Sequence, residues 1–198
     1  METARTSVRP YRQQARAEAA ERTRIDILEA TVGLALDGAH ASFSLNDVAA
    51  RAEVSVQTVL RHFGTREGLF EAALAYGTAS ITEERAAPAG DLAAAVSALV
   101  GHYERRGDGV IRLLAQEPFD ARIAVVTRRG RVTHRRWVEG LVPPGVDVGD
   151  TLMDQLVVVT DVYVWKLLRR DRGLSRRDTE DRIRGLVEAV LAGVGEAP

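Results

Sequence analysis

Residues 43–70 read FSLNDVAARAEVSVQTVLRHFGTREGLF and predict two short helices joined by the turn AEV. Each predicted helix begins at a serine, Ser44 or Ser55, whose hydroxyl can accept a hydrogen bond from a free backbone N–H. Asp47 follows Ser44 by three residues, which is the spacing of a capping box. Apolar side chains at helical spacing predict the inward faces of the two helices: Val48, Ala49, Ala52, Val59 and Phe63.

The second helix, expected over residues 55–63, is too short to be stable in isolation, so we expect its neighbour to hold it in place. Its outward side chains are Val56, Gln57 and Arg61, with Thr58 and Leu60 in part. The major groove of B-DNA admits one helix, and Gln and Arg are side chains that read bases there. The pattern favours a DNA-reading helix, and the alternative is an ordinary helical hairpin in a core.

The stretch 43–74, FSLNDVAARAEVSVQTVLRHFGTREGLFEAAL, resembles the N-terminal domain of TetR-type (tetracycline-repressor-like) transcription regulators. The matching positions are Ser44, Asp47, Val48, Ala49, Ala52, Val54, Ser55, Thr58, Val59, His62, Phe63, Thr65, Arg66, Glu67 and Leu69. With the preceding helix, the resemblance covers about residues 20–76; the C-terminal part resembles the family only weakly, at residues 164–180. It implies a helix-turn-helix domain followed by a larger helical domain that binds a small molecule and dimerises.

The resemblance also implies which side chains meet double-stranded DNA. Phosphate contacts are implied near Ser44, Thr58, His62 and Arg66, and base contacts near Val56, Gln57 and Arg61. Ser55 and Leu60 complete the candidate DNA-binding set. For His62 the alternative is a packed histidine that closes the short helix, and for Arg66 it is a solvated charge.

Two residues depart from the family pattern. Glu53 stands where the family has a turn glycine, and a non-glycine residue there costs on the order of 1 kcal/mol if the turn needs a positive φ. Leu60 stands where the family often has tyrosine, so a hydroxyl is missing and the side chain can touch a thymine methyl group or simply pack. These departures motivate an alternative function, a helical small-molecule-binding protein that has lost its affinity for DNA.

The composition predicts an all-α protein. The chain has 198 residues, 45% of them hydrophobic, and its formal net charge of −1 would argue against a nucleic-acid-binding protein. Residues 1–24, however, hold six arginines and three glutamates, and a local basic segment matters more for DNA than the total charge. We expect residues 1–20 to form a flexible basic arm; the alternative is a solvated tail without a role. Cysteine is absent from the sequence, which excludes disulfides.

The helical patterns divide the chain into the arm, a helix-turn-helix domain over residues 21–76 and a ligand-binding and dimerisation domain over residues 77–198. The helices are expected at 15–36, 44–51, 55–63, 65–85, 91–105, 108–116, 121–141, 149–171 and 176–194. The N-terminus has no apolar leader, and the longest apolar stretch, 156–168, is too short to span a bilayer. We therefore expect a cytoplasmic protein.

Two C-terminal helices are expected to form a homodimer. The helix expected over 149–171 is apolar on nearly all sides, so both of its faces must be covered. The helix expected over 176–194 carries an apolar stripe of Ile183, Leu186, Val187, Val190 and Val194. One face can meet a partner subunit, and the alternative is a thick monomeric core.

Aromatic and histidine side chains suggest where a small ligand binds. Along the expected helix 121–141, one inward stripe holds Ile123, Val126, Gly130, His134, Trp137 and Leu141. The candidate ligand-binding residues are His102, Tyr103, His134, Trp137 and Tyr163. Aromatic side chains with polar tips favour a small apolar or aromatic ligand, whereas the alternative for the tryptophans is core packing.

The sequence lacks the motifs of common enzymes. G-x-S-x-G, G-x-G-x-x-G, P-loop and H-E-x-x-H patterns are all absent, and the four histidines do not have metal-ligand spacing. Five arginines in residues 128–136 are expected to form a solvated helix face. We therefore predict a ligand-responsive DNA-binding regulator, a repressor released from an inverted-repeat operator, with no cofactor and no enzymatic activity.

Overall fold

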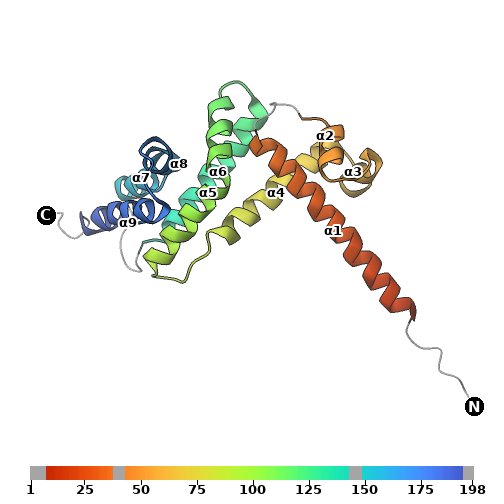
Figure 1. The fold of residues 1–198 in the computed structure, drawn as a ribbon, viewed down its shortest axis with the longest axis horizontal. Coiled ribbons are helices and arrows are strands. Elements are labelled where there is room, and N and C mark those ends of the chain that lie inside the picture. Colours follow the sequence, from red (N-terminus) through yellow and green to blue (C-terminus); the bar gives the residue numbers. More distant parts are fainter. Residues whose placement is uncertain (1–7, 38–42, 143–148, 194–198) are drawn as a thin grey trace, which may run out of the picture. The chain divides into compact units, whose positions relative to one another are not determined.

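The computed structural model describes residues 8–37, 43–142 and 149–193, and every regular element within these ranges is helical (Figure 1). The expected all-α class is confirmed. The helices are α1 (Val8–Asp37), α2 (Leu45–Arg51), α3 (Val56–Phe63), α4 (Arg66–Glu84), α5 (Leu92–Gln116), α6 (Ala121–Glu139), α7 (Asp150–Val159), α8 (Val162–Lys166) and α9 (Arg176–Ala192). A π-helical turn, η1 (Leu167–Asp171), extends α8.

The chain forms two compact units, and the divisions between them fall after Leu34 in α1 and after Ala75 in α4. The first unit holds most of α1, together with α2, α3 and the start of α4. Its buried apolar side chains come from all four of these helices: Ile27, Leu28, Ala30, Val48, Ala49, Val59, Leu69 and Ala73. A helix as short as α3 is therefore held by tertiary packing rather than by its own propensity.

α1 begins earlier than the sequence pattern predicts. Residues 8–14, which lie in the expected flexible arm and precede the expected helix 15–36, are helical, while residues 1–7 lie outside the described part of the chain. The cause is composition, because Ala, Arg, Gln and Glu are strong helix formers. The side chains of residues 13–20 are exposed, so this part of α1 presents its polar groups to solvent.

α5 replaces two helices expected over 91–105 and 108–116. Gly107 falls in the gap between the two expected helices, but in the structure Gly107 and Gly109 lie buried inside one continuous helix. A Cβ atom at Gly107 would collide with the ring of Trp165, 2.8 Å from its Cη2 atom, and one at Gly109 would lie 2.8 Å from Leu36 O. The glycines therefore serve close packing, which offsets their low helix propensity.

The single helix expected over 149–171 is divided at Thr160 and Asp161. Asp161 accepts a hydrogen bond from Tyr163 N (2.8 Å) and so caps a new helix, α8. Thr160 Oγ1 donates back to Leu156 O (2.6 Å) at the end of α7. Short polar side chains compete in this way with continuous helix, and the apolar run on either side hid the break.

In the second unit, α7, α8 and α9 pack beside α5 and α6 (Figure 1). One core cluster joins α5, α8 and α9 around the fully buried Trp165 and Ile183. A second joins α6, α7 and α9 around Val138, Leu156 and Val187. Trp165 is thus a core residue, which was the alternative considered from the sequence.

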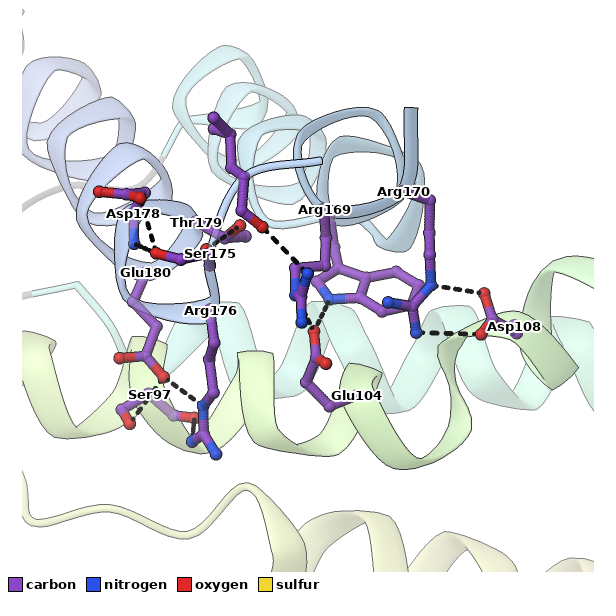
Figure 2. Close-up of polar contacts among 12 residues, drawn as sticks. Ser97, Glu104, Asp108, Arg169, Arg170, Ser175, Arg176, Asp178, Thr179 and Glu180 are labelled. Atoms are coloured by element: carbon purple, nitrogen blue, oxygen red, sulfur yellow. Dashed lines mark hydrogen bonds and ion pairs between the residues drawn. The ribbon is translucent and has the colours of Figure 1, made fainter. Parts of the chain in front are cut away.

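Polar pairs fasten α8, η1 and α9 to α5 (Figure 2). Glu104 accepts hydrogen bonds from Trp165 Nε1 (3.0 Å) and Arg169 Nε (2.9 Å). Arg170 forms two hydrogen bonds with Asp108, 3.2 and 3.0 Å long. Partly exposed ion pairs contribute little to the free energy of unfolding, so we assign these pairs mainly to the orientation of the helices. None of the helices in the described ranges is long and apolar enough to cross a membrane.

Candidate functional sites

The entrance to α2 has the local geometry that the sequence predicts. Ser44 N donates to Asp47 Oδ2 (2.7 Å), and Asp47 N donates to Ser44 Oγ (3.3 Å), which completes the capping box. Val48 and Ala49 are buried, so the inward face of α2 begins directly after this cap. The cap fixes where α2 begins and therefore the direction in which it approaches α3.

The turn between α2 and α3 is closed by backbone hydrogen bonds from Ala52 N to Val48 O and from Val54 N to Ala49 O, each 2.9 Å long. Glu53 lies in this turn with a φ of 54°, and it is the one non-glycine residue with positive φ among the described residues. The departure noted in the sequence therefore falls on a position that requires a left-handed backbone. The hydrogen bonds of the turn are nevertheless formed.

α3 is held in place by its N-cap and by one buried side chain, and most of its outward side chains are exposed. Ser55 caps the helix by accepting from Thr58 N (3.1 Å), and the two hydroxyl oxygens lie 2.9 Å apart. Val59 is fully buried and seats the helix on its neighbours. The exposed side chains of α3 are Gln57, Leu60 and Arg61, while Val56 and Thr58 are half-buried.

The end of α3 and the start of α4 carry the remaining predicted DNA-binding residues. His62 is half-buried, and its ring centroid lies 6.2 Å from that of Phe63. The Arg24 guanidinium lies over the Phe63 ring, 5.8 Å from its centroid. Arg66 is exposed, and its Nη2 donates to Phe43 O (2.9 Å), which places this cation beside the N-cap of α2.

A second group of candidate residues surrounds Arg85, which follows α4 in the second unit. The side chain of Arg85 is buried (7% of the residue is exposed), and its Nη1 donates to His134 Nδ1 over 3.2 Å. Trp137 Nε1 donates to the backbone oxygen of Arg85 (3.2 Å), and the guanidinium lies 5.2 Å from the centroid of the Tyr103 ring. Three of the five predicted ligand-binding residues therefore meet at this arginine.

His102, the fourth, lies next to the same cluster through Glu84. The Glu84 carboxylate accepts from His102 Nδ1 (2.6 Å) and from Arg106 Nε and Nη2 (3.0 and 2.6 Å). Burial raises the pKa of Glu84, but the hydrogen bonds from Arg106 and His102 outweigh it and lower that pKa to about 2. Glu84 is therefore a carboxylate whose oxygens are already occupied.

The hydrogen bonds determine the tautomer of His134. Arg85 can only donate, so Nδ1 of His134 accepts, and Nε2 carries the proton that is donated to Thr160 Oγ1 (3.1 Å). Thr160 in turn donates to Leu156 O, and its backbone oxygen accepts from Tyr103 Oη (2.9 Å). His134 is thus a neutral imidazole that links α6 to the end of α7.

Burial is the main cause of the shifted pKa values in this cluster. It lowers the pKa of His102 to about 3 and that of His134 to about 4, and the charge of Arg85 adds to both shifts. Burial also lowers the pKa of Arg85, although an arginine remains charged at any physiological pH. The cluster therefore contains one buried cation beside two neutral imidazoles.

Four of the candidate ligand-binding residues are brought together by the structure, but sequence reasoning missed the three residues that join them, Glu84, Arg85 and Thr160. Arg85 is the last residue of the charged stretch EER (83–85) at a predicted helix end, a pattern typical of a solvated charge, so nothing in the sequence marked it as buried. Tyr163 is not brought into the cluster, since 51% of it is exposed. The arginines of residues 128–136 lie on the exposed face of α6, as expected. No set of three or more Asp, Glu or His side chains in the described ranges could hold a metal ion.

The fold and the α2–α3 pair define a helix-turn-helix protein with a larger helical second unit. The model of the family described as bacterial regulatory proteins, tetR family, matches residues 27–73. No curated protein matches the chain. The resemblance noted from the sequence is therefore confirmed: the chain carries the N-terminal domain of the tetR family.

Solved structures of TetR-type regulators share the fold across most of the chain. A transcriptional regulator from Rhodococcus sp. Rha1 has a TM-score of 0.62 and 21% identity, over 87% of this chain and 98% of its own. A TetR-like transcriptional regulator from Rhodococcus sp. RHA1 has a TM-score of 0.60 and 21% identity, over 86% and 96%. A protein from Mesorhizobium loti MAFF303099, classed as a TetR-family transcriptional regulator, has a TM-score of 0.60 and 17% identity, over 88% and 97%.

Proposed function

We propose that this protein is a homodimeric transcriptional repressor that binds an inverted-repeat operator through α3 and is released by a small molecule bound in the second unit. The observation that carries the proposal is the contrast along α3. Val59 is fully buried and holds the helix, whereas Gln57 and Arg61 are exposed and available for bases. Such a rigidly held, polar-faced short helix suits insertion into the major groove.

Exposed arginines of α1 and α4 favour contacts to DNA phosphates. Arg66 lies at the start of α4, and its link to Phe43 O holds it beside the cap of α2. The exposed residues of α1 include Arg16 and Arg22. Contacts of this kind position a protein on DNA without reading its sequence, and they make affinity fall steeply with salt concentration.

The alternative function, a ligand-binding protein without DNA affinity, rested on Glu53 and Leu60. Glu53 adopts the left-handed conformation that the turn needs, and the turn hydrogen bonds are formed. Leu60 is 38% exposed on α3, where a thymine methyl group is a suitable contact. Neither departure removes the surface that α3 offers, so repression through DNA binding is the function that we favour.

Exposed apolar side chains on the C-terminal helices support a dimer. Val158 on α7, Tyr163 on α8, Leu167 on η1 and Leu186 on α9 are 61%, 51%, 53% and 41% exposed. Exposed apolar side chains concentrated on neighbouring elements are typical of interfaces. A twofold-symmetric dimer through these helices would supply two copies of α3, as an inverted-repeat operator requires.

The proposal is tested by DNA binding. Fluorescence anisotropy with DNA fragments that flank the protein's own gene should identify one fragment that is bound with an affinity at least a hundredfold above that for random DNA. Footprinting should then locate two half-sites about one helical turn apart. Equal affinity for all fragments at physiological salt would contradict a sequence-specific repressor.

A further inference from the structure

Arg85 is a buried cation without a carboxylate partner. No carboxylate oxygen in the described part of the chain lies within 4.0 Å of its guanidinium. Glu84, its neighbour in sequence, directs both oxygens to His102, Arg106 and Arg105 instead. The groups in contact with Arg85 are His134, Tyr103 and Trp137, all uncharged, and the carboxylates of Glu84 and Asp161 act on its charge only from beyond 4.0 Å. Arg85 therefore has no direct ion-pair partner among the described residues, and more distant carboxylates offset its charge only in part.

Two polar atoms of the cluster lack a hydrogen-bond partner among the described residues. They are Arg85 Nε, which is a donor, and His102 Nε2. Because His102 Nδ1 donates to Glu84, the Nε2 of the neutral imidazole is an acceptor. A buried donor on a cation is costly to leave unpaired, and folded proteins pair the great majority of such groups. An anion with an acceptor oxygen would pair with Arg85 Nε and offset the charge of the guanidinium at the same time.

The side chains around Arg85 indicate the chemical nature of the rest of such a ligand. Trp137 is half-buried and stacks on His134 with ring centroids 5.8 Å apart and an angle of 16° between the planes. Tyr103 lies under the guanidinium, and its hydroxyl is already used by Thr160 O. Flat, uncharged rings next to a guanidinium suit an apolar or aromatic body, and the planar guanidinium fork matches a carboxylate.

We infer that the effector of this protein is an organic monocarboxylate with an apolar or aromatic body, and that its carboxylate pairs with Arg85. This inference rests on the proposed function, because it names the chemical class of the small molecule that the second unit binds. It keeps the apolar or aromatic body expected from the sequence and adds the charged head that the sequence did not indicate. Trp137 and His134 flank the body of the ligand, and Arg85 binds its head.

The test uses three matched pairs of probes with the full-length protein: benzoate, phenylacetate and octanoate, each against its amide. Binding is measured by isothermal titration calorimetry and by the rise in melting temperature. At least one carboxylate should bind, and its amide should bind at least tenfold more weakly, because the amide shares the body but lacks the charge. If no carboxylate binds, or if amides bind as well as carboxylates, the inference is wrong.

Variants assign the binding to Arg85. Arg85→Gln should weaken carboxylate binding at least tenfold and leave amide binding unchanged. Arg105→Gln is the matched control, since Arg105 also lies near Glu84 (3.4 Å) but is exposed, and it should bind the carboxylate like the wild type. If Arg85→Gln does not fold, Arg85→Lys keeps the charge while losing the planar fork and should show a severalfold loss. Unchanged carboxylate binding in a folded Arg85 variant overturns the inference.

The DNA measurement separates this inference from the proposed function. A carboxylate that binds at Arg85 but does not release the operator confirms Arg85 as its binding residue but overturns its assignment as the effector, while the DNA-binding part of the proposed function is unaffected. A neutral molecule that releases the operator, with no carboxylate effect, overturns the inference and leaves repression intact.

Discussion

Glu53 holds a backbone conformation that glycine adopts without strain. Its φ of 54° places it in the left-handed region, where a Cβ costs about 1 kcal/mol. We predict that Glu53→Gly raises the free energy of unfolding by about 0.5–1 kcal/mol, and that Glu53→Ala does not, because alanine keeps the Cβ. Differential scanning calorimetry of the three proteins measures this. An equal gain from both variants would mean that the glutamate side chain, and not the backbone, is unfavourable.

The two buried histidines make stability depend on pH. In the folded protein their pKa values are about 3 (His102) and 4 (His134), below the unfolded value of 6.5. The unfolded chain therefore binds protons that the folded chain excludes, so this stability is complete above pH 6.5 and is lost as the pH falls below it. We predict a free energy of unfolding about 3 kcal/mol lower at pH 5 than at pH 7. Glu84 acts in a lower window, below pH 4.5.

Urea unfolding followed by tryptophan fluorescence measures this change in the second unit, which contains both tryptophans. Asn is a suitable replacement because its amide can donate like His102 Nδ1, and its oxygen can accept like His134 Nδ1. Either His102→Asn or His134→Asn should roughly halve the difference between pH 7 and pH 5. A difference that both variants leave unchanged would assign the pH dependence to other groups.

The sequence was informative for single residues where their role is local. The caps at Ser44 and Ser55 depend on neighbours three residues away, and the structure contains both. The strained turn at Glu53 was likewise visible as the loss of a glycine. Arg85 was missed because its burial depends on side chains 18 to 52 residues away, in α5 and α6, which no local pattern encodes.

At the scale of one element, variants in α3 and at the start of α4 should distinguish contacts to bases from contacts to phosphates. Gln57→Ala should weaken binding to the preferred operator by about 1–3 kcal/mol. It should weaken binding much less to an operator in which the base pair that Gln57 contacts has already been changed. Gln116→Ala, on α5, is the matched control and should bind as the wild type does. Competition binding across a set of single-base-pair operator variants measures the effect, and a uniform loss on all of them would exclude base reading by Gln57.

Arg66→Ala should behave differently, weakening binding to every sequence. A phosphate contact carries no base preference, and its removal lowers the slope of log affinity against log salt by about one unit. Anisotropy titrations at several salt concentrations measure that slope. An unchanged slope with lower affinity would mean that Arg66 acts only through its hydrogen bond to Phe43 O.

The bounds of an element could be predicted from the sequence where polar capping residues mark its ends. The prediction failed where tertiary packing outweighs local helix propensity. α2, α3 and α9 begin at capping serines, and their expected and observed ranges nearly coincide. α5 was expected as two helices with Gly107 in the gap between them, whereas in the structure Gly107 and Gly109 admit neighbouring side chains within one helix. The break between α7 and α8 was hidden because both sides of Asp161 are equally apolar.

At the scale of the whole molecule, the proposed dimer makes distinct predictions for exposed and buried apolar residues. Val158→Asp or Leu186→Asp places a charge on a surface that is exposed in one subunit, so the subunit should fold but not pair. Size-exclusion chromatography with light scattering should show a monomer with weak operator affinity. Val132→Asp is the control, because Val132 is 54% exposed on the arginine-rich face of α6, and it should remain dimeric.

The sequence placed Val187 and Ile183 on the same stripe as Leu186 and suggested all of them for the interface. The structure instead buries Ile183 and Val187 completely in the core of their own subunit, while Val194 lies outside the described residues. Val187→Asp should therefore unfold the second unit rather than separate subunits. Sequence periodicity identified the apolar face of α9. It could not show which side chains of that face pack in the core of their own subunit and which remain exposed for a partner subunit.

The close approach of Gly107 and Trp165 couples the evolution of two positions that lie 58 residues apart in the chain. Any single substitution at Gly107 adds a Cβ that the indole already excludes, at a cost of about 1–3 kcal/mol. A smaller ring at position 165 would make room for alanine at 107, but alone it would leave a cavity in the core. Each change is harmful without the other, so lineages that descend from this protein would pass from one pair to the other only through a less stable ancestor.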